Sequence, residues 1–193
     1  MKKLALFISI FILMSTVFKK EKVYFPKSTF VSLTEKTVNL PADAKGKFTV
    51  VFVAMNKKGI DTMFTWFKKM DTALVYTKNN NAVLVEDQLD DNLYFIIAGK
   101  NAGTNISGRV LDTLTKNKEL DLKDNILFYA GVPDTLSTSL KISNPDKLTG
   151  FVLNYNGVIV YRFSGVYTEP KWKALKEILA DPDASSYDHQ YQK

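Results

Sequence analysis

Three uninterrupted apolar runs, each followed by a segment of helical periodicity, organise the central part of the chain. Residues 47–54, 93–98 and 126–130 are rich in β-branched and aromatic side chains and show no alternation of polar and apolar positions. Such runs are typical of strands buried on both faces of a parallel or mixed sheet. Apolar residues spaced three and four positions apart predict helices over residues 60–74, 105–114 and 134–140. Asp61, near the start of the first helix, is predicted to cap it or to favour its dipole.

Shorter strands are predicted on either side of this central part. Residues 29–33 and 37–40 carry the composition of a short strand pair near the N-terminus. Residues 151–155 and 158–163 flank the dipeptide Asn156-Gly157. A type I′ turn needs positive φ at both central residues, which Asn-Gly tolerates, so this segment predicts an antiparallel hairpin.

The last predicted helix opens at Thr168, a capping residue that is followed by a proline in the first turn, and it ends at Pro182. The order of strands and helices predicts an α/β, three-layer fold. In it a central mixed sheet is covered by helices on both faces and is closed by a C-terminal β-hairpin plus helix. We expect one domain over residues 23–182 and a polar flexible tail over residues 183–193.

The first 22 residues differ in composition from the rest of the chain. Met1, Lys2 and Lys3 precede an apolar run over residues 4–18, and a charged collar over residues 19–22 closes it. This pattern predicts a signal peptide or a short N-terminal membrane anchor, and a core helix explains it less well because the run is apolar on every side. No Ala-x-Ala cleavage pattern is present. We therefore expect export to the cell envelope, either as a periplasmic protein or held in the membrane by the N-terminus.

Composition excludes several classes of function. The chain contains no cysteine among its 193 residues, so disulfides, thiol catalysis, zinc–thiolate sites and a lipoprotein anchor are ruled out. The N-terminal segment over residues 1–22 supplies four of the six net positive charges. Because the remaining charge is spread thinly and forms no basic stripe, we expect no nucleic-acid partner.

Few residues offer catalytic or metal-binding chemistry. His189 is the only histidine and lies in the polar tail, where no catalytic or metal-binding cluster can be built around it. A group of acidic residues matches no calcium-loop spacing and fits a capped turn better: Glu86, Asp87, Asp90 and Asp91. We expect no metal, no cofactor and no enzymatic activity.

Several short segments resemble the start of TlpA-type thioredoxin-like proteins. They are Phe25-Pro26, residues 36–40, residues 45–47 and residues 50–54. In that family a Cys-x-x-Cys motif follows the strand, and its positions are occupied here by Lys57-Lys58-Gly59-Ile60. The family's cis-proline falls at Leu148 or Thr149 in this chain. The resemblance implies a thioredoxin-like fold that has lost both its thiols and its groove-shaping proline.

A narrower resemblance links the C-terminal half to the mitochondrial ATP-synthase assembly-factor family. It is carried by residues 125–131, 136–142, 149–154 and 160–165. Members of that family are membrane-associated and thioredoxin-like and lack the redox motif. The resemblance implies a role in assisting the assembly of a membrane complex.

The same resemblance places a candidate binding cleft at one edge of the sheet. The candidate residues come from the loop after the central strand and from the approach to the hairpin: Met55, Asn56, Lys57, Lys58, Gly59, Leu148, Thr149 and Gly150. We expect an apolar lip at Met55 and Leu148, a basic lip at Lys57 and Lys58, and main-chain hydrogen bonds from Thr149-Gly150 to an extended segment. The alternative is that Leu148 packs inward and that the two lysines are merely solvated.

These observations favour a non-catalytic binding or assembly module that meets a protein partner at or near a membrane. A divergent thioredoxin- or peroxiredoxin-like enzyme acting without cysteine and a secreted structural protein are the alternatives. Partner identity and oligomeric state stay open.

Overall fold

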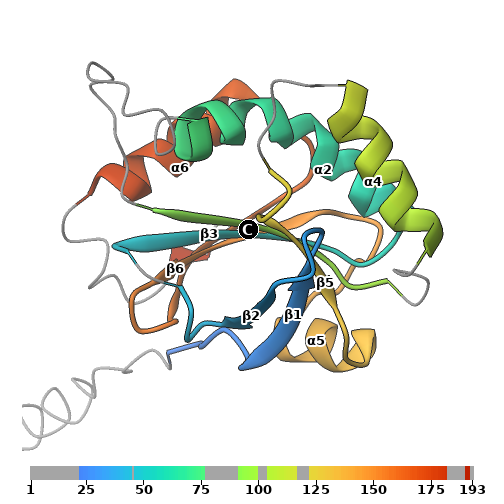
Figure 1. The fold of residues 1–193 in the computed structure, drawn as a ribbon. Coiled ribbons are helices and arrows are strands. Elements are labelled where there is room, and N and C mark those ends of the chain that lie inside the picture. The colour runs from blue at the N-terminus through green and yellow to red at the C-terminus, as the bar shows by residue number, and fades with distance from the viewer. Residues whose placement is uncertain are drawn as a thin grey trace, which may run out of the picture.

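A mixed sheet forms the centre of the protein, whose computed structural model describes residues 22–44, 46–76, 91–99, 104–116, 122–181 and 190–191. The strand order is β2-β1-β5-β4-β3-β6-β7-β8 (Figure 1). The strands are β1 (Ser28–Ser32), β2 (Thr37–Leu40), β3 (Phe48–Ala54), β4 (Asn92–Ile97), β5 (Ile126–Tyr129), β6 (Thr149–Asn154), β7 (Ile159–Ser164) and β8 (Gln190–Tyr191). The helices are α2 (Lys57–Met70), its π-helical extension η1 (Asp71–Tyr76), α4 (Thr104–Lys116), α5 (Pro133–Ser139) and α6 (Glu169–Ala180).

Helices cover both faces of this sheet. Helices α2, α4 and α6 lie on one face and the short helix α5 on the other (Figure 1). The sequence of strand β3 has no polar alternation because both of its faces are covered. Phe48, Val50 and Phe52 pack toward α2, while Val51 and Val53 pack toward α5. The predicted three-layer α/β architecture is confirmed.

Strand β3 lies where the parallel and antiparallel halves of the sheet meet. It pairs parallel with β4 and antiparallel with β6. Strand β4 pairs parallel with β5, and β6 pairs antiparallel with β7. The C-terminal end of β3 therefore lies beside the N-terminal end of β6, with Val53 opposite Thr149. This register places the two predicted cleft segments next to each other.

The hairpin between β6 and β7 exists, but its predicted turn type is wrong. Gly157 N–H donates to the Asn154 carbonyl at 2.8 Å, so the central residues of the turn are Tyr155 and Asn156. Positive φ occurs in this loop only at Gly157, at 74°. A type I′ turn would require positive φ at Asn156 as well. The glycine instead follows the turn and occupies the left-handed position that joins it to the next strand.

Several predicted segments lie outside the described residues: residues 1–21 of the export segment, the acidic residues Glu86, Asp87 and Asp90, and His189. Asp91 is described, and it is buried with its Oδ1 accepting a hydrogen bond from Phe48 N–H at 2.9 Å. Two residues of the expected flexible tail, Gln190 and Tyr191, pair with β7 as strand β8. Within the described part of the chain, no helix combines the length and hydrophobicity needed to cross a membrane.

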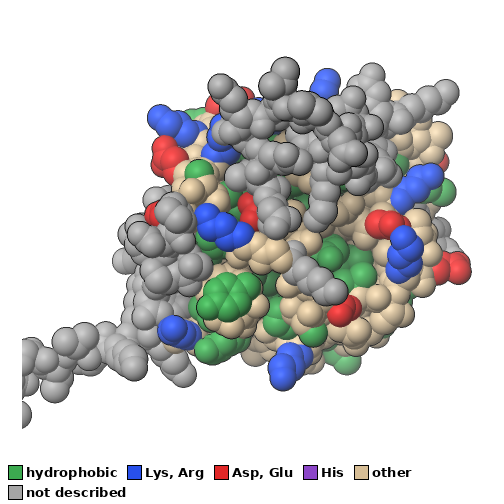
Figure 2. Space-filling view, turned by 60° about the vertical axis from the view of Figure 1, so that its left-hand side comes forward, with side chains coloured by type: hydrophobic (Ala, Val, Ile, Leu, Met, Phe, Trp, Pro, Cys, Tyr) green, Lys and Arg blue, Asp and Glu red, His purple; other side chains and the backbone are tan. Residues whose placement is uncertain are grey.

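Charged side chains on the described surface are intermixed. On the face drawn in Figure 2, lysine and arginine side chains are scattered among aspartate and glutamate side chains and do not gather in a stripe. Three ion pairs also join described residues far apart in the sequence, namely Lys36–Asp124, Lys58–Asp146 and Arg109–Asp61. The second of these pairs lies at the candidate site.

Candidate functional site

The first half of the candidate site is the sharp passage from β3 into α2. Asn56 is extended, with φ −157° and ψ −176°, and its side-chain Oδ1 accepts a hydrogen bond from Gly59 N–H at 3.1 Å. Asn56 is thus the N-cap that starts the helix at Lys57. The predicted capping role of Asp61 is wrong, because its carboxylate lies beyond the first turn and pairs with Arg109 at 2.6 Å.

The second half is the turn that leads into β6. Within it, Asn144 Oδ1 accepts a hydrogen bond from Asp146 N–H at 2.9 Å and so fixes the turn. Asp146 then faces α2, where Oδ1 accepts from Asn56 Nδ2 at 2.6 Å and Oδ2 accepts from Lys58 Nζ at 2.7 Å. The predicted neighbourhood of the two segments is confirmed, and Asp146 is the residue that links them.

Asp146 and Lys58 form a solvent-exposed ion pair. Hydrogen bonding by Lys58, followed by that of Asn56, lowers the pKa of the Asp146 carboxyl, and the same contact with Asp146 raises the pKa of Lys58. A lowered carboxyl pKa contributes to stability above the ordinary range of aspartate, and the contribution is lost as pH falls below about 4. Because both groups are exposed, the pair orients the loop more than it stabilises the fold.

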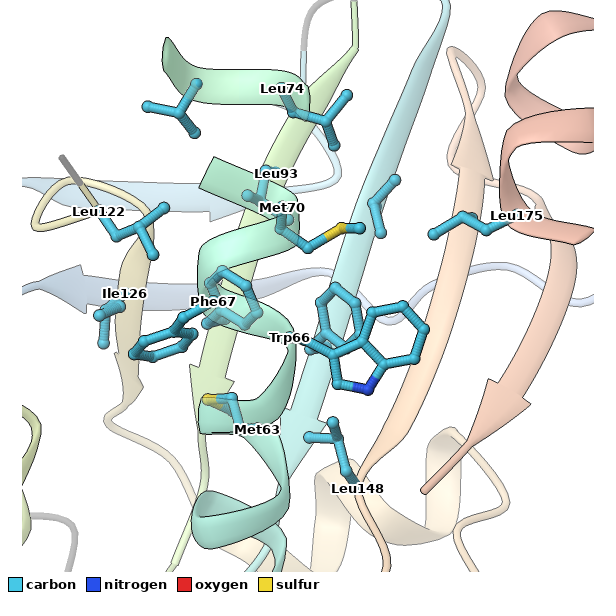
Figure 3. Close-up of a cluster of buried hydrophobic side chains, with 14 of the residues drawn as sticks. Met63, Trp66, Phe67, Met70, Leu74, Leu93, Leu122, Ile126, Leu148 and Leu175 are labelled. Carbon is cyan, nitrogen blue, oxygen red and sulfur yellow. The ribbon is translucent and has the colours of Figure 1, made fainter. Parts of the chain in front are cut away.

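The predicted apolar lip of the cleft is wrong. Met55 is 9% exposed and Leu148 is 1% exposed, and they belong to cores on opposite faces of the sheet. Figure 3 shows Leu148 beneath Trp66, among the side chains packed under α2. The alternative, in which Leu148 packs inward, is the arrangement found. No cis bond precedes Thr149, since the one cis peptide among the described residues is Leu40–Pro41.

The main chain at Thr149-Gly150 is not open to an added strand. Strand β6 lies between two partners, with Thr149 opposite both Val53 and Ser164 and with Gly150 opposite both Phe52 and Phe163. Both edges of this segment are therefore already paired. The predicted main-chain hydrogen bonds to an extended ligand are ruled out at these two residues.

The exposed part of the candidate site is a small polar surface. It consists of Asn56, Lys57, Lys58 and Asp146, and we call it the polar loop surface. Gly59, Thr149 and Gly150 are buried behind it. The surface carries amide, ammonium and carboxylate groups and no thiol. These groups can form hydrogen bonds and ion pairs with a partner.

Sequence reasoning missed Asp146. The usable signal was the run Asn144-Pro145-Asp146, a strong turn sequence, directly before the predicted strand. A helix N-terminus with two neighbouring lysines attracts an anion, and the protein supplies that anion from its own chain.

Comparison with solved structures identifies the fold. BsSco, a member of the Sco family of cytochrome c oxidase assembly proteins, matches with a TM-score of 0.53 and 14% identity over 87% of this chain and 96% of its own. A putative electron transfer protein from Aquifex aeolicus VF5 matches with a TM-score of 0.52 and 12% identity over 88% and 97%. A thioredoxin family thiol:disulfide interchange protein from Chlorobium tepidum TLS matches with a TM-score of 0.52 and 11% identity over 82% and 97%.

These likenesses confirm the predicted thioredoxin-like fold, and at such identities they concern the fold alone. No family model matches the chain, and no curated protein matches it significantly. The narrower resemblance to ATP-synthase assembly factors stays a prediction.

The predicted alignment of residues 57–60 with a Cys-x-x-Cys motif can be tested with two cysteines. Lys57 is exposed and Ile60 is fully buried, at the first and fourth positions of α2. The double substitution Lys57→Cys and Ile60→Cys should form a disulfide under mild oxidation, with a lowered pKa at the first thiol from the helix dipole and Lys58. Thiol titration and mass spectrometry measure both effects. A pair that stays reduced contradicts the alignment, and Lys57→Cys with Thr62→Cys is the mismatched control.

Proposed function

We propose that this protein is a non-catalytic, thioredoxin-like binding or assembly module of the cell envelope that engages a protein partner through the polar loop surface. The observation that carries the proposal is the site itself. Where this fold can hold two thiols, the chain has Lys57 and Ile60 and closes the loop with an Asn56–Asp146–Lys58 network. A loop held in this way keeps a fixed shape for recognition but has no redox group.

The route of the chain into the fold supports a membrane-proximal role. Val23 and Phe25 hydrogen bond to Ile159 and Gly157, next to the turn that follows β6. The polar loop surface lies at the opposite end of β6, which has six residues and therefore spans roughly 17 Å. If residues 4–18 hold the protein at a membrane, the end of the fold where Val23 and Phe25 enter is the end nearer the bilayer, and the polar loop surface is at the other end.

Two exposed tyrosines support the same orientation. Tyr24 is 56% exposed near the chain entry, and Tyr155 is 67% exposed in the β6–β7 turn. Tyrosine side chains, which are apolar along the ring and polar at the tip, suit a membrane–water boundary. Among the fold neighbours, BsSco belongs to a family of oxidase assembly proteins, and by analogy an assembly role fits this fold.

A charge reversal tests the proposed surface. Lys58→Glu places a second carboxylate beside Asp146, so the loop should open and recovery of a partner from solubilised membranes should fall at least about fivefold. The matched control is Lys116→Glu on α4, an exposed lysine far from the loop in the sequence. Quantitative mass spectrometry of cross-linked membranes measures recovery, and circular dichroism checks the fold.

Each part of the proposal has its own contrary outcome. Recovery that is unchanged in Lys58→Glu and equal to that of Lys116→Glu contradicts the polar loop surface as the contact. Wild-type protein that is found wholly in the soluble fraction, beginning near Val23, contradicts anchoring and leaves the binding role intact.

A further inference from the structure

A second hollow lies beside the candidate site and has a different chemistry. It has a volume of about 380 Å³ and opens between the turn that leads into β6, strand β7 and the first turns of α6. Three cationic residues from these three elements line it, namely Lys147, Arg162 and Lys171. Among the described residues that line this pocket, none is acidic. We call it the basic pocket.

Arg162 is held in place by the fold. Its two terminal nitrogens donate to the Leu140 carbonyl at 3.2 Å and the Lys141 carbonyl at 2.9 Å, just after α5. Its guanidinium carbon lies 5.3 Å from the ring centre of Phe151. These contacts hold the guanidinium on the α5 side of the sheet, whereas Lys171 belongs to α6 on the opposite face.

Lys147 and Lys171 supply the other two positive charges of the basic pocket. Lys171 Nζ donates to the Val166 carbonyl at 3.0 Å, which uses one of its three hydrogens and positions the ammonium group. Lys147 is exposed on the turn. Neutral hydrogen-bonding residues also line the pocket, namely Ser143, Asn144, Thr149 and Ser164.

Nearby carboxylates are directed to other groups. Asp146, next to Lys147 in the sequence, binds Lys58 and Asn56 on the other side of the turn. Glu169 lies two residues before Lys171 and interacts with Tyr167. Burial, followed by a hydrogen bond to Glu169, raises the pKa of that tyrosine. Neither carboxylate lines the pocket.

We propose that the basic pocket binds an oxyanion, a carboxylate or phosphate group, through Lys147 and Lys171, with Arg162 adding positive charge from the α5 side of the sheet. Charged hydrogen bonds from lysine and arginine are the usual means of holding such groups. The proposal does not depend on the polar loop surface, but the two sites share the turn that contains Asn144 and Asp146. An anion in the pocket therefore contacts the turn that positions the loop.

Titration with inorganic phosphate at neutral pH tests the proposal. Saturable shifts are expected in the backbone amide NMR signals of Asn144, Thr149 and Ser164. Lys147→Gln and Lys171→Gln should each weaken binding about threefold to tenfold, and the double variant more, because both substitutions remove the charge and keep a polar side chain. Lys173→Gln, on the same helix and outside the pocket lining, is the matched control and should bind like wild type. Increasing salt should also weaken phosphate binding to the wild-type protein, because salt screens the attraction between charges.

A second probe separates the sources of the anion. A short acetylated peptide of glycine and glutamate that binds at least about tenfold more tightly than phosphate at the same amides indicates a carboxylate carried by a protein segment. Equal or weaker peptide binding indicates a free small anion. Absence of saturable shifts with both probes overturns the proposal, and so does binding that is unchanged in the Lys147→Gln and Lys171→Gln double variant.

Discussion

Replacing Trp66 by alanine is expected to lower the free energy of unfolding by about 3–5 kcal/mol, the range for removing a large buried aromatic side chain. Trp66 is fully buried, and the ring centres of Phe52, Phe163 and Tyr167 lie 5.1, 5.2 and 5.3 Å from its own. Urea denaturation monitored by circular dichroism gives the change from the shift in midpoint at a constant slope.

The tryptophan also connects the core to the candidate site. Its Nε1 donates to the Gly165 carbonyl at 3.0 Å, and Gly165 N–H donates to the Leu148 carbonyl at 2.9 Å, directly before β6. Trp66→Phe keeps most of the ring and removes this hydrogen bond, so it should cost less, about 1–2 kcal/mol. A cost below about 1 kcal/mol for Trp66→Ala would show that the cavity closes or that the ring is not buried.

The sequence predicted the sheet well for a physical reason. A strand that is covered on both faces must be apolar at every position, so β3 is visible as a continuous run from Phe48 to Ala54. The helix after it is visible because one face packs on the sheet, with Ile60, Met63 and Phe67 buried at helical spacing. Burial therefore leaves a local pattern in both kinds of element.

The burial and the contacts of the candidate-site residues leave no such pattern in the sequence. Met55 and Leu148 stand at strand ends, where exposure depends on which elements cover them, and both are buried by segments distant in sequence. Asp146 meets Lys58 across 88 positions, a contact that charge spacing along the chain does not indicate. The pairing of β8 with β7 was missed because a strand of two residues has no periodicity.

The hairpin shows how a correct prediction can rest on a wrong reason. Asn156-Gly157 marked the turn, but the side chain of Asn154 organises it by accepting hydrogen bonds from Asn156 and Val158 N–H, both at 3.0 Å. That bonding moves the turn one residue earlier and leaves Gly157 to supply the positive φ. A dipeptide preference thus located the hairpin without fixing its geometry.

The second large effect on stability is expected from Gly150→Ala, because an aromatic ring lies over this glycine. Gly150 of β6 lies opposite Phe163 of β7, and a Cβ added to Gly150 would lie 2.2 Å from Cζ of that ring. The ring is held by Phe52 and Trp66, with centre distances of 5.5 and 5.2 Å. Gly150→Ala should therefore force the ring aside and lower the free energy of unfolding by about 1–3 kcal/mol.

A double-mutant cycle separates this clash from other effects of the added methyl group. In a Phe163→Ala background the space above Gly150 is empty, so Gly150→Ala should cost less than about 0.5 kcal/mol there. The difference between the two backgrounds, measured by urea denaturation, is the coupling between the methyl group and the ring. An equal cost in both backgrounds would show that the ring contact is not the cause. The methyl group would then act through the neighbouring backbone of β3, to which Gly150 is paired at Phe52.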